Sequence, residues 1–287
     1  MDKVINEIDY TLTKEDNNEL MYTTIVIFVL MGIIYFSAFE NYSYTCKNIV
    51  VNVYLYVLVS LLIFHVMTLS IVKMKYNIVY YKIISKYNIF ITFIVLIAIF
   101  IGLFFVFYKV ENNIIASHIM LLIIIGFFSL ISSIQYAVLK KNNLYNKVFQ
   151  TTVVLVFILL LLFYIYQDKI KQYLTNNYVF IVLMLFVLVI IIELLYILIY
   201  GYNKYITIVI STIVIIIFGY FLLANTQYVL NITPDKCNDA LINCNTSLSK
   251  LNCNINDYPS YPQKSFSIFN DIIMIFQNIA QIFLATD

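Results

Sequence analysis

Charged residues are scarce in this sequence of 287 residues. Only 11% are Asp, Glu, Lys or Arg and 63% are hydrophobic, whereas soluble domains contain about 45–50% apolar and about 25% charged residues. Glycine and proline are scarce too, with five and three residues. Their scarcity excludes a collagen-like or linker-rich chain, and the apolar density excludes intrinsic disorder. The composition therefore predicts an integral membrane protein.

Arginine is absent, so all 17 basic residues are lysines. An ammonium group cannot clamp a carboxylate in the two-point geometry of a guanidinium. The lysines form no basic patch, which argues against nucleic-acid binding. The loops also lack histidine, clustered carboxylates and a glycine-rich phosphate cradle, so neither metal-dependent hydrolysis nor nucleotide chemistry has its parts. We therefore expect neither an enzyme nor a bound cofactor or metal.

Long apolar runs dominate the chain. A bilayer core about 30 Å thick is crossed by roughly 20 apolar residues in a helix. Runs of about this size cover residues 20–39, 48–72, 87–108, 112–139, 148–167, 178–200, 205–224 and 265–286. They predict an all-α, polytopic membrane bundle of seven or eight helices with the C-terminal helix central.

Four parts follow from these runs. Residues 1–19 form an acidic tail without the basic flank of a signal peptide, residues 20–224 a bundle of seven spans, residues 225–264 a polar loop, and residues 265–287 a C-terminal membrane helix. With alternate crossing, the N-terminal side receives more loop lysines, so the positive-inside rule places the N-terminus in the cytosol. Either an endomembrane of ER or Golgi type or the plasma membrane fits these features.

The cysteines fall on one predicted side of the membrane. They are Cys46, Cys237, Cys244 and Cys253. Sequons that begin at Asn41, Asn231 and Asn245 share that side, which favours an oxidising compartment and disulfide bonds. Four reduced cysteines are the alternative. Zinc is disfavoured, because the C-x6-C-x8-C spacing has no nearby histidine.

Few ionisable residues interrupt the apolar runs. Such groups are costly in lipid and usually face a bundle interior or a water-filled path. His118 lies near a predicted helix end, where histidine is ordinary, whereas His65 is either a neutral packing residue or a proton-responsive group. Glu193 lines an inter-helix seam or an ion pathway; Lys204, about 16 Å along the helix, is too distant to pair with it. Asp271 is the fourth such residue.

The last run carries a polar stripe. Asn270, Asp271, Gln277, Asn278 and Gln281 recur at helical spacings among isoleucine and phenylalanine. Such a pattern is typical of a helix with one narrow face turned to water or to polar partners within a bundle. A surface-lying amphipathic helix is the competing interpretation, but its polar face would be rich in lysine, and this face has none. We therefore expect an inserted, inward-facing helix.

Two strings resemble the last two helices of the Bax inhibitor family, the transmembrane Bax inhibitor motif proteins that include the lifeguard branch. They are FLLANTQYVL, residues 221–230, and SFSIFNDIIMIFQNIAQIF, residues 265–283. Asn225-Thr226-Gln227 matches the family's D-T-Q signature, and residues 269–276 match its Y-L-D-I-I-N-L-F, with Asp271 on the aspartate. The match covers about 30 of the 287 residues.

The resemblance implies a cation (calcium) leak channel, or a calcium/proton-linked channel, that modulates calcium balance and cell death. In the family, two carboxylates are thought to share a proton and latch the pore, because two close carboxylates cannot both ionise cheaply. Asn225 replaces one of them and cannot titrate, so we expect a weakened or absent pH latch. Asp271, Asn225, Glu193 and His65 are the expected pathway or latch residues, with Glu193 a possible substitute partner for Asp271.

The chain also departs from the family pattern. The family has seven helices and a short connection before the last, whereas this chain has eight apolar runs and a forty-residue loop. The competing interpretation is a non-transporting membrane anchor or interaction protein. Its disulfide-bonded loop would then bind a partner outside the cytosol.

Overall fold

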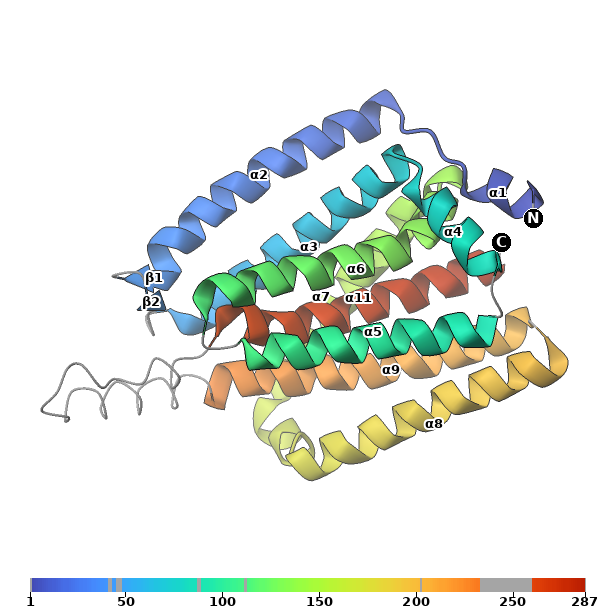
Figure 1. The fold of residues 1–287 in the computed structure, drawn as a ribbon. Coiled ribbons are helices and arrows are strands. Elements are labelled where there is room, and N and C mark those ends of the chain that lie inside the picture. The colour runs from blue at the N-terminus through green and yellow to red at the C-terminus, as the bar shows by residue number, and fades with distance from the viewer. Residues whose placement is uncertain are drawn as a thin grey trace, which may run out of the picture. The chain divides into compact units, whose positions relative to one another are not determined.

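The computed structural model describes residues 2–40, 43–44, 48–86, 89–110, 113–201, 203–232 and 260–286. Nearly all of these residues are helical (Figure 1). The exceptions include an antiparallel pair of two-residue strands, β1 (Phe39–Glu40) and β2 (Ser43–Tyr44). The all-α architecture predicted from the sequence is confirmed.

Seven helices of the described residues are long and apolar enough to cross a membrane. They are α2 (Lys14–Ala38), α3 (Ile49–Lys73), α6 (Ile114–Lys141), α7 (Tyr145–Ile170), α8 (Asn176–Tyr200), α9 (Lys204–Gln227) and α11 (Tyr261–Thr286). The apolar helix α5 (Ile89–Lys109) occupies the remaining predicted run. Helices are expected in such runs, because lipid offers no partner to backbone N–H and C=O groups. The protein is an integral, multi-pass membrane protein.

The helices form two compact units. Unit 1 contains Met1–Lys141 and Val229–Phe266, and unit 2 contains Asn142–Tyr228 and Ser267–Asp287. The division falls inside the stretch of residues 20–224 that the sequence presented as one bundle. It coincides with a tight turn in which Asn143 adopts a left-handed backbone conformation, which asparagine tolerates better than most residues.

Unit 1 is built on α2, α3 and α6, which lie side by side (Figure 1). Small polar residues let α3 and α6 approach closely, as is common between membrane helices. Ser60, Ser129, Ser132 and Ser133 are all buried. Ser129 also donates a hydrogen bond of 3.3 Å to the backbone carbonyl of Phe64, so the contact satisfies the hydroxyl group as well.

Two short helices of unit 1 lie where the sequence suggested a tail and a loop. They are α1 (Asp2–Ile8) and α4 (Tyr76–Lys86). The buried Asn77 of α4 donates a hydrogen bond of 2.9 Å to the carbonyl of Ile8, at the end of α1. The apolar runs of the sequence do not reveal α4, because this helix contains lysines and is too short and too polar to span a membrane.

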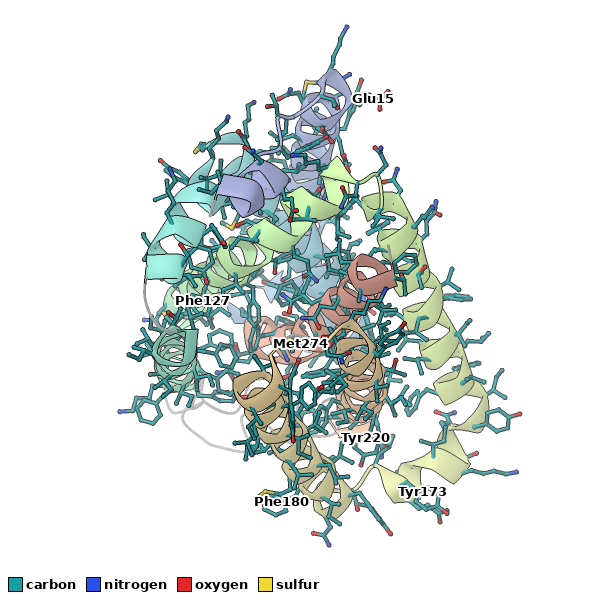
Figure 2. All side chains as sticks on the ribbon, turned by 90° about the vertical axis from the view of Figure 1, so that its right-hand side faces the viewer. Glu15, Phe127, Tyr173, Phe180, Tyr220 and Met274 are labelled. Carbon is teal, nitrogen blue, oxygen red and sulfur yellow. The ribbon has the colours of Figure 1, made fainter. Side chains whose placement is uncertain are left out.

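Unit 2 contains α7, η1 (Lys171–Tyr173), α8, α9 and most of α11. Gly201, in a left-handed conformation, ends α8 three residues before α9 begins. The short connection makes α8 and α9 antiparallel neighbours, and Phe186 contacts Phe218 edge-to-face at 5.0 Å between ring centroids. Many side chains of α7 project away from the other helices of this unit (Figure 2), as expected of a surface that faces lipid, whereas the Tyr173 ring of η1 contacts Tyr178 of α8 edge-to-face at 6.1 Å.

Helix α11 is the most deeply buried of the seven long helices. In its apolar window 56% of the residues are buried, against 44% or less in each of the others. This burial agrees with an inserted helix rather than one lying on the membrane surface. The helix begins at Tyr261, and α9 is followed by the π-helical turn η2 (Tyr228–Ile232). Both ends of the predicted polar loop, residues 225–264, are therefore helical.

Candidate functional site

The site centres on Asp271, a carboxyl group in the middle of α11. Its side chain is 3% exposed. The Nδ2 atom of Asn225, on α9, donates a hydrogen bond of 2.7 Å to its Oδ2 atom. Both residues belong to unit 2. This hydrogen bond joins the two positions that match the carboxylate pair of the family that the sequence resembles.

A second hydrogen bond joins the same two helices. The buried Ser211 of α9 donates to Oε1 of Gln281, on α11, at 2.9 Å. Ser211 precedes Asn225 in the chain, whereas Gln281 follows Asp271, so the two bonds define an antiparallel helix pair. The bonds are separated by 14 residues on α9, which is about 21 Å of helix. Polar contacts thus occur at two levels of one apolar interface.

The polar stripe of α11 is only partly buried. Asp271 and Asn278, seven residues apart and on one face, are buried, while Asn270 and Gln277 are half-buried and Gln281 is exposed. Asn278 donates a hydrogen bond of 2.8 Å to the carbonyl of Met274 on its own helix. The most polar side of the helix therefore faces inward at Asp271 and turns gradually outward toward Gln281.

Glu193 lies on the face of α8 that packs against α9. It is seven residues from Phe186 and, like Phe186, half-buried. Phe186 of α8 contacts Phe218 of α9. Because the two helices are antiparallel, seven residues forward along α8 and seven residues backward along α9 reach positions that face each other, namely Glu193 and Ser211. Ser211 is about 21 Å along α9 from Asn225, so the structure does not bring Glu193 to Asp271. The suggestion that Glu193 substitutes for the missing carboxylate finds no support in this geometry.

His65 belongs to unit 1, where it joins two other helices. Its Nε2 atom lies 3.0 Å from Oε1 of Glu19, on α2. Its Nδ1 atom lies 3.3 Å from the hydroxyl group of Tyr136, on α6. Because the carboxylate can only accept, Nε2 carries a hydrogen, and in the neutral imidazole Nδ1 then accepts from Tyr136. His65 is thus part of a polar chain that reaches Glu19.

The carboxyl groups of Glu19 and Asp16 share one lysine. Nζ of Lys140, in the last turn of α6, lies 3.0 Å from Oε2 of Glu19 and 2.9 Å from Oδ1 of Asp16. Asp16 also closes the capping box of α2 with Thr13 and accepts a hydrogen bond of 2.6 Å from the hydroxyl group of Tyr10. Burial, together with this bond to a carboxylate, raises the pKa of Tyr10 to about 12. We call Tyr10, Asp16, Glu19, His65, Tyr136 and Lys140 the polar network of unit 1.

Sequence reasoning missed most of this network. The pattern Thr13-x-x-Asp16 is a local signal for a helix start, and it would have moved the start of α2 from Leu20 to Lys14. No local signal could have paired Glu19 with Lys140, because the two residues are 121 positions apart. In the sequence, Lys140 is simply one of the loop lysines on the N-terminal side of the membrane.

Some expected features lie outside the described residues, namely Cys46, Cys237, Cys244 and Cys253. In the described part of the chain, no group of three or more His, Cys, Asp or Glu side chains could hold a metal ion.

The third residue of the D-T-Q-like string, Gln227, is buried, and its side-chain oxygen accepts no hydrogen bond from the described residues.

Comparisons with family models, curated proteins and solved structures find no match. The resemblance to the Bax inhibitor family therefore rests on the two strings in α9 and α11. What the geometry adds is an intramembrane carboxyl group, enclosed by neighbouring helices and hydrogen-bonded to an amide.

Proposed function

We propose that this protein is a cation-permeable channel or leak of Bax-inhibitor type, with Asp271 in the permeation pathway and Asn225 holding its carboxyl group. Calcium is the cation that the resemblance suggests, and calcium balance and cell-death signalling are the corresponding cellular roles. The buried position of Asp271 between membrane helices is the observation that carries the proposal.

The energetic cost of this carboxyl group supports a functional role. An ionisable side chain inside a membrane helix is expensive to bury, and such residues commonly mark ion or proton pathways. Asp271 could be replaced by leucine or isoleucine if α11 served only as an anchor, because apolar residues such as Ile268, Ile272 and Ile275 occupy neighbouring positions on the helix. The hydrogen bond from Asn225 occupies one acceptor position of the carboxyl group and leaves acceptor capacity for a proton or a metal cation.

Polar groups further along the same helices extend the proposed pathway. Asn278 lies two turns beyond Asp271, and the Ser211–Gln281 bond follows about one turn later. Glu193 lies opposite Ser211 on α8. Oxygen atoms of carboxylates, amides and hydroxyl groups are the ligands that calcium prefers, so these levels offer suitable chemistry for a hydrated or partly hydrated cation. Glu193 would then serve the pathway at a separate level from Asp271.

Asn225 changes how the site responds to pH. An aspartate at this position would share a proton with Asp271, because two carboxylates 2.7 Å apart cannot both be charged at low cost. The amide remains neutral at every physiological pH and keeps donating to Asp271. We therefore propose that the cation pathway lacks the carboxylate-pair pH latch of the family.

Reconstitution tests the proposal. The purified chain is placed in liposomes that contain a calcium-sensitive dye, and calcium entry is measured for wild type, Asp271→Asn and Asp168→Asn. Asp271→Asn removes the charge while keeping the size and the hydrogen bonding of the side chain. Asp168 is the matched control, because it is an exposed aspartate in α7 of the same unit. We expect calcium entry to fall at least tenfold in Asp271→Asn and to stay at the wild-type level in Asp168→Asn.

Two results would reject the channel. One is calcium entry that persists in Asp271→Asn, and the other is the absence of any cation flux in correctly folded wild type. Replacing calcium by potassium or protons in the same liposomes, with the matching dyes, identifies the permeant cation.

A further inference from the structure

The polar network of unit 1 contains an unequal number of charges. Asp16 and Glu19 supply two carboxylates, and Lys140 supplies one ammonium group that contacts both. Most of this charge is shielded from solvent, since the Asp16 and Lys140 side chains are 6% and 11% exposed. An excess negative charge in such a setting is costly. A proton on His65, which contacts Glu19 directly, would make the network neutral.

The geometry of His65 suits a proton-binding site. The Glu19 carboxylate accepts a hydrogen bond from Nε2 whether the imidazole is neutral or charged. The Tyr136 hydroxyl group can donate to a neutral Nδ1 atom and can accept from a protonated one, because a hydroxyl group does both. Protonation therefore breaks no contact. Glu19 is 39% exposed, so the aqueous phase can deliver the proton through it.

His118 provides an internal comparison. Its Nδ1 atom lies 2.6 Å from the carbonyl of Ile114, which fixes the hydrogen on Nδ1. Its Nε2 atom then accepts from the hydroxyl group of Tyr56 at 2.8 Å. These two contacts of His118 are with uncharged groups, whereas His65 contacts the Glu19 carboxylate.

The network also holds the N-terminal segment, residues 2–19, in place. Four further contacts connect this segment to the ends of α3, α4 and α6 and to the turn between α3 and α4. Lys141 donates to the carbonyl of Asn6, Asn77 to the carbonyl of Ile8 and Lys73 to the side chain of Asn17, and Lys75 forms an ion pair with Asp9. The Lys75–Asp9 pair is largely exposed and therefore weak. The contacts of Asp16 and Glu19 are the more buried ones.

We propose that His65 is a proton-binding site that fastens the N-terminal segment to α3 and α6 when it is protonated. An imidazolium bonded to Glu19 is a charge-assisted pair, stronger than the bond from a neutral ring. Glu19 and Asp16 lie one turn apart on α2, and Asp16 holds Tyr10 and Thr13. A tighter hold on Glu19 therefore stabilises the capping box and the segment before it.

The other titratable groups around His65 leave this assignment in place. On α2 they are Asp16 and Glu19, and on α6 they are Tyr136 and Lys140. On α3 itself Lys73 lies two turns later, and α4, which also packs on α3, carries Tyr80 and Lys82. Burial raises the pKa of Tyr80, so Tyr80 stays neutral in the range where an ordinary histidine titrates.

Hydrogen–deuterium exchange tests the proposal on the full chain in lipid nanodiscs. Exchange of peptides covering residues 9–19 is measured at pH 7.5, 6.5 and 5.5 and corrected for the intrinsic pH dependence of amide exchange. In wild type we expect protection to rise about fivefold toward pH 5.5. His65→Gln, which keeps a hydrogen-bonding side chain but cannot become charged, should remove the rise. His118→Gln should leave it unchanged.

Glu19→Gln keeps the test decisive if His65→Gln fails to fold. This variant retains His65 but removes the carboxylate that stabilises the protonated imidazole, so the rise in protection should again disappear. The proposal is overturned if wild type shows no rise, if the rise survives in His65→Gln or Glu19→Gln, or if His118→Gln abolishes it.

Discussion

Gly219 on α9 lies directly against Leu159 on α7. A methyl group added at Gly219 would come within 3.3 Å of Leu159 Cδ1, which is closer than two carbon atoms normally approach. Membrane helices often meet at small residues, because dispersion contacts between close backbones replace the hydrophobic driving force that lipid removes. This glycine therefore sets the distance between α7 and α9 inside unit 2.

Replacing Gly219 tests this packing. We expect Gly219→Ala to cost about 1 kcal/mol, because Leu159 can yield by a few tenths of an ångström, and Gly219→Leu to cost about 3 kcal/mol or more through overpacking. Thermal unfolding in detergent measures both. Gly32→Ala in α2 is the control, since nothing lies within 4 Å of its added methyl group, and it should be neutral or slightly stabilising. Equal effects of alanine at the two glycines would contradict the close approach.

Lys140 is the second target, because its ammonium group contacts both Asp16 and Glu19. In Lys140→Met the apolar stem keeps its packing, but two carboxylates lose their shared partner. We expect a loss of about 2 kcal/mol. This is below the usual cost of breaking a buried ion pair, because Glu19 is partly exposed and Asp16 keeps other donors. Lys75→Met, which breaks an exposed pair with Asp9, should cost less than about 1 kcal/mol.

Because of Tyr10, we expect the N-terminal segment to lose stability at alkaline pH. Its pKa is raised to about 12 by burial and by its bond to Asp16, above the usual value near 10 in an unfolded chain. A group with a raised folded-state pKa contributes its full stabilisation below the unfolded pKa and loses it as the pH rises through the folded value. Wild type should therefore lose about 1 kcal/mol between pH 10 and 12 relative to Tyr10→Phe. Chemical unfolding curves at the two pH values measure this loss. Tyr22→Phe, at an exposed tyrosine of α2, should lose the same stability as wild type.

The positions of the membrane helices were predictable because lipid imposes them. An apolar run of sufficient length has no stable alternative to a helix in a bilayer, so each predicted run coincides with a helix. The ends were less predictable. The start of α2 depends on the capping contact between Thr13 and Asp16, and the start of α11 at Tyr261 depends on tertiary contacts, such as the stacking of Tyr261 on Tyr56 at 5.6 Å.

The candidate site was predictable only through the resemblance. Helical periodicity placed Asp271 on a polar face of its helix, but it contained no information on the register between α9 and α11. That register follows from two bonds, Asn225–Asp271 and Ser211–Gln281. Whether Glu193 lies near Asp271 depends on a register of the same kind, and the antiparallel α8–α9 hairpin with its short turn sets Glu193 opposite Ser211. The polar network around Lys140 needed long-range pairing that no local pattern encodes.

Asn225→Asp provides the last test, because it restores the second carboxyl group at the site. Two carboxyl groups in the 2.7 Å contact now made by Asn225 and Asp271 must share a proton. The folded variant then binds more protons than the unfolded chain, so its stability relative to wild type should fall as the pH rises, by up to about 1.4 kcal/mol per pH unit. Calcium entry into liposomes should depend more steeply on pH in this variant than in wild type, where Asp271 faces the amide of Asn225 rather than a second carboxyl group. Asn203→Asp is the matched control, since a carboxylate at the exposed N-cap of α9 accepts the same hydrogen bond from Tyr205 without a second carboxyl group beside it. An Asn225→Asp protein with the same pH dependence as wild type would mean that the two side chains separate when both are charged, and the Asn225–Asp271 contact would then have no role in latching the pathway.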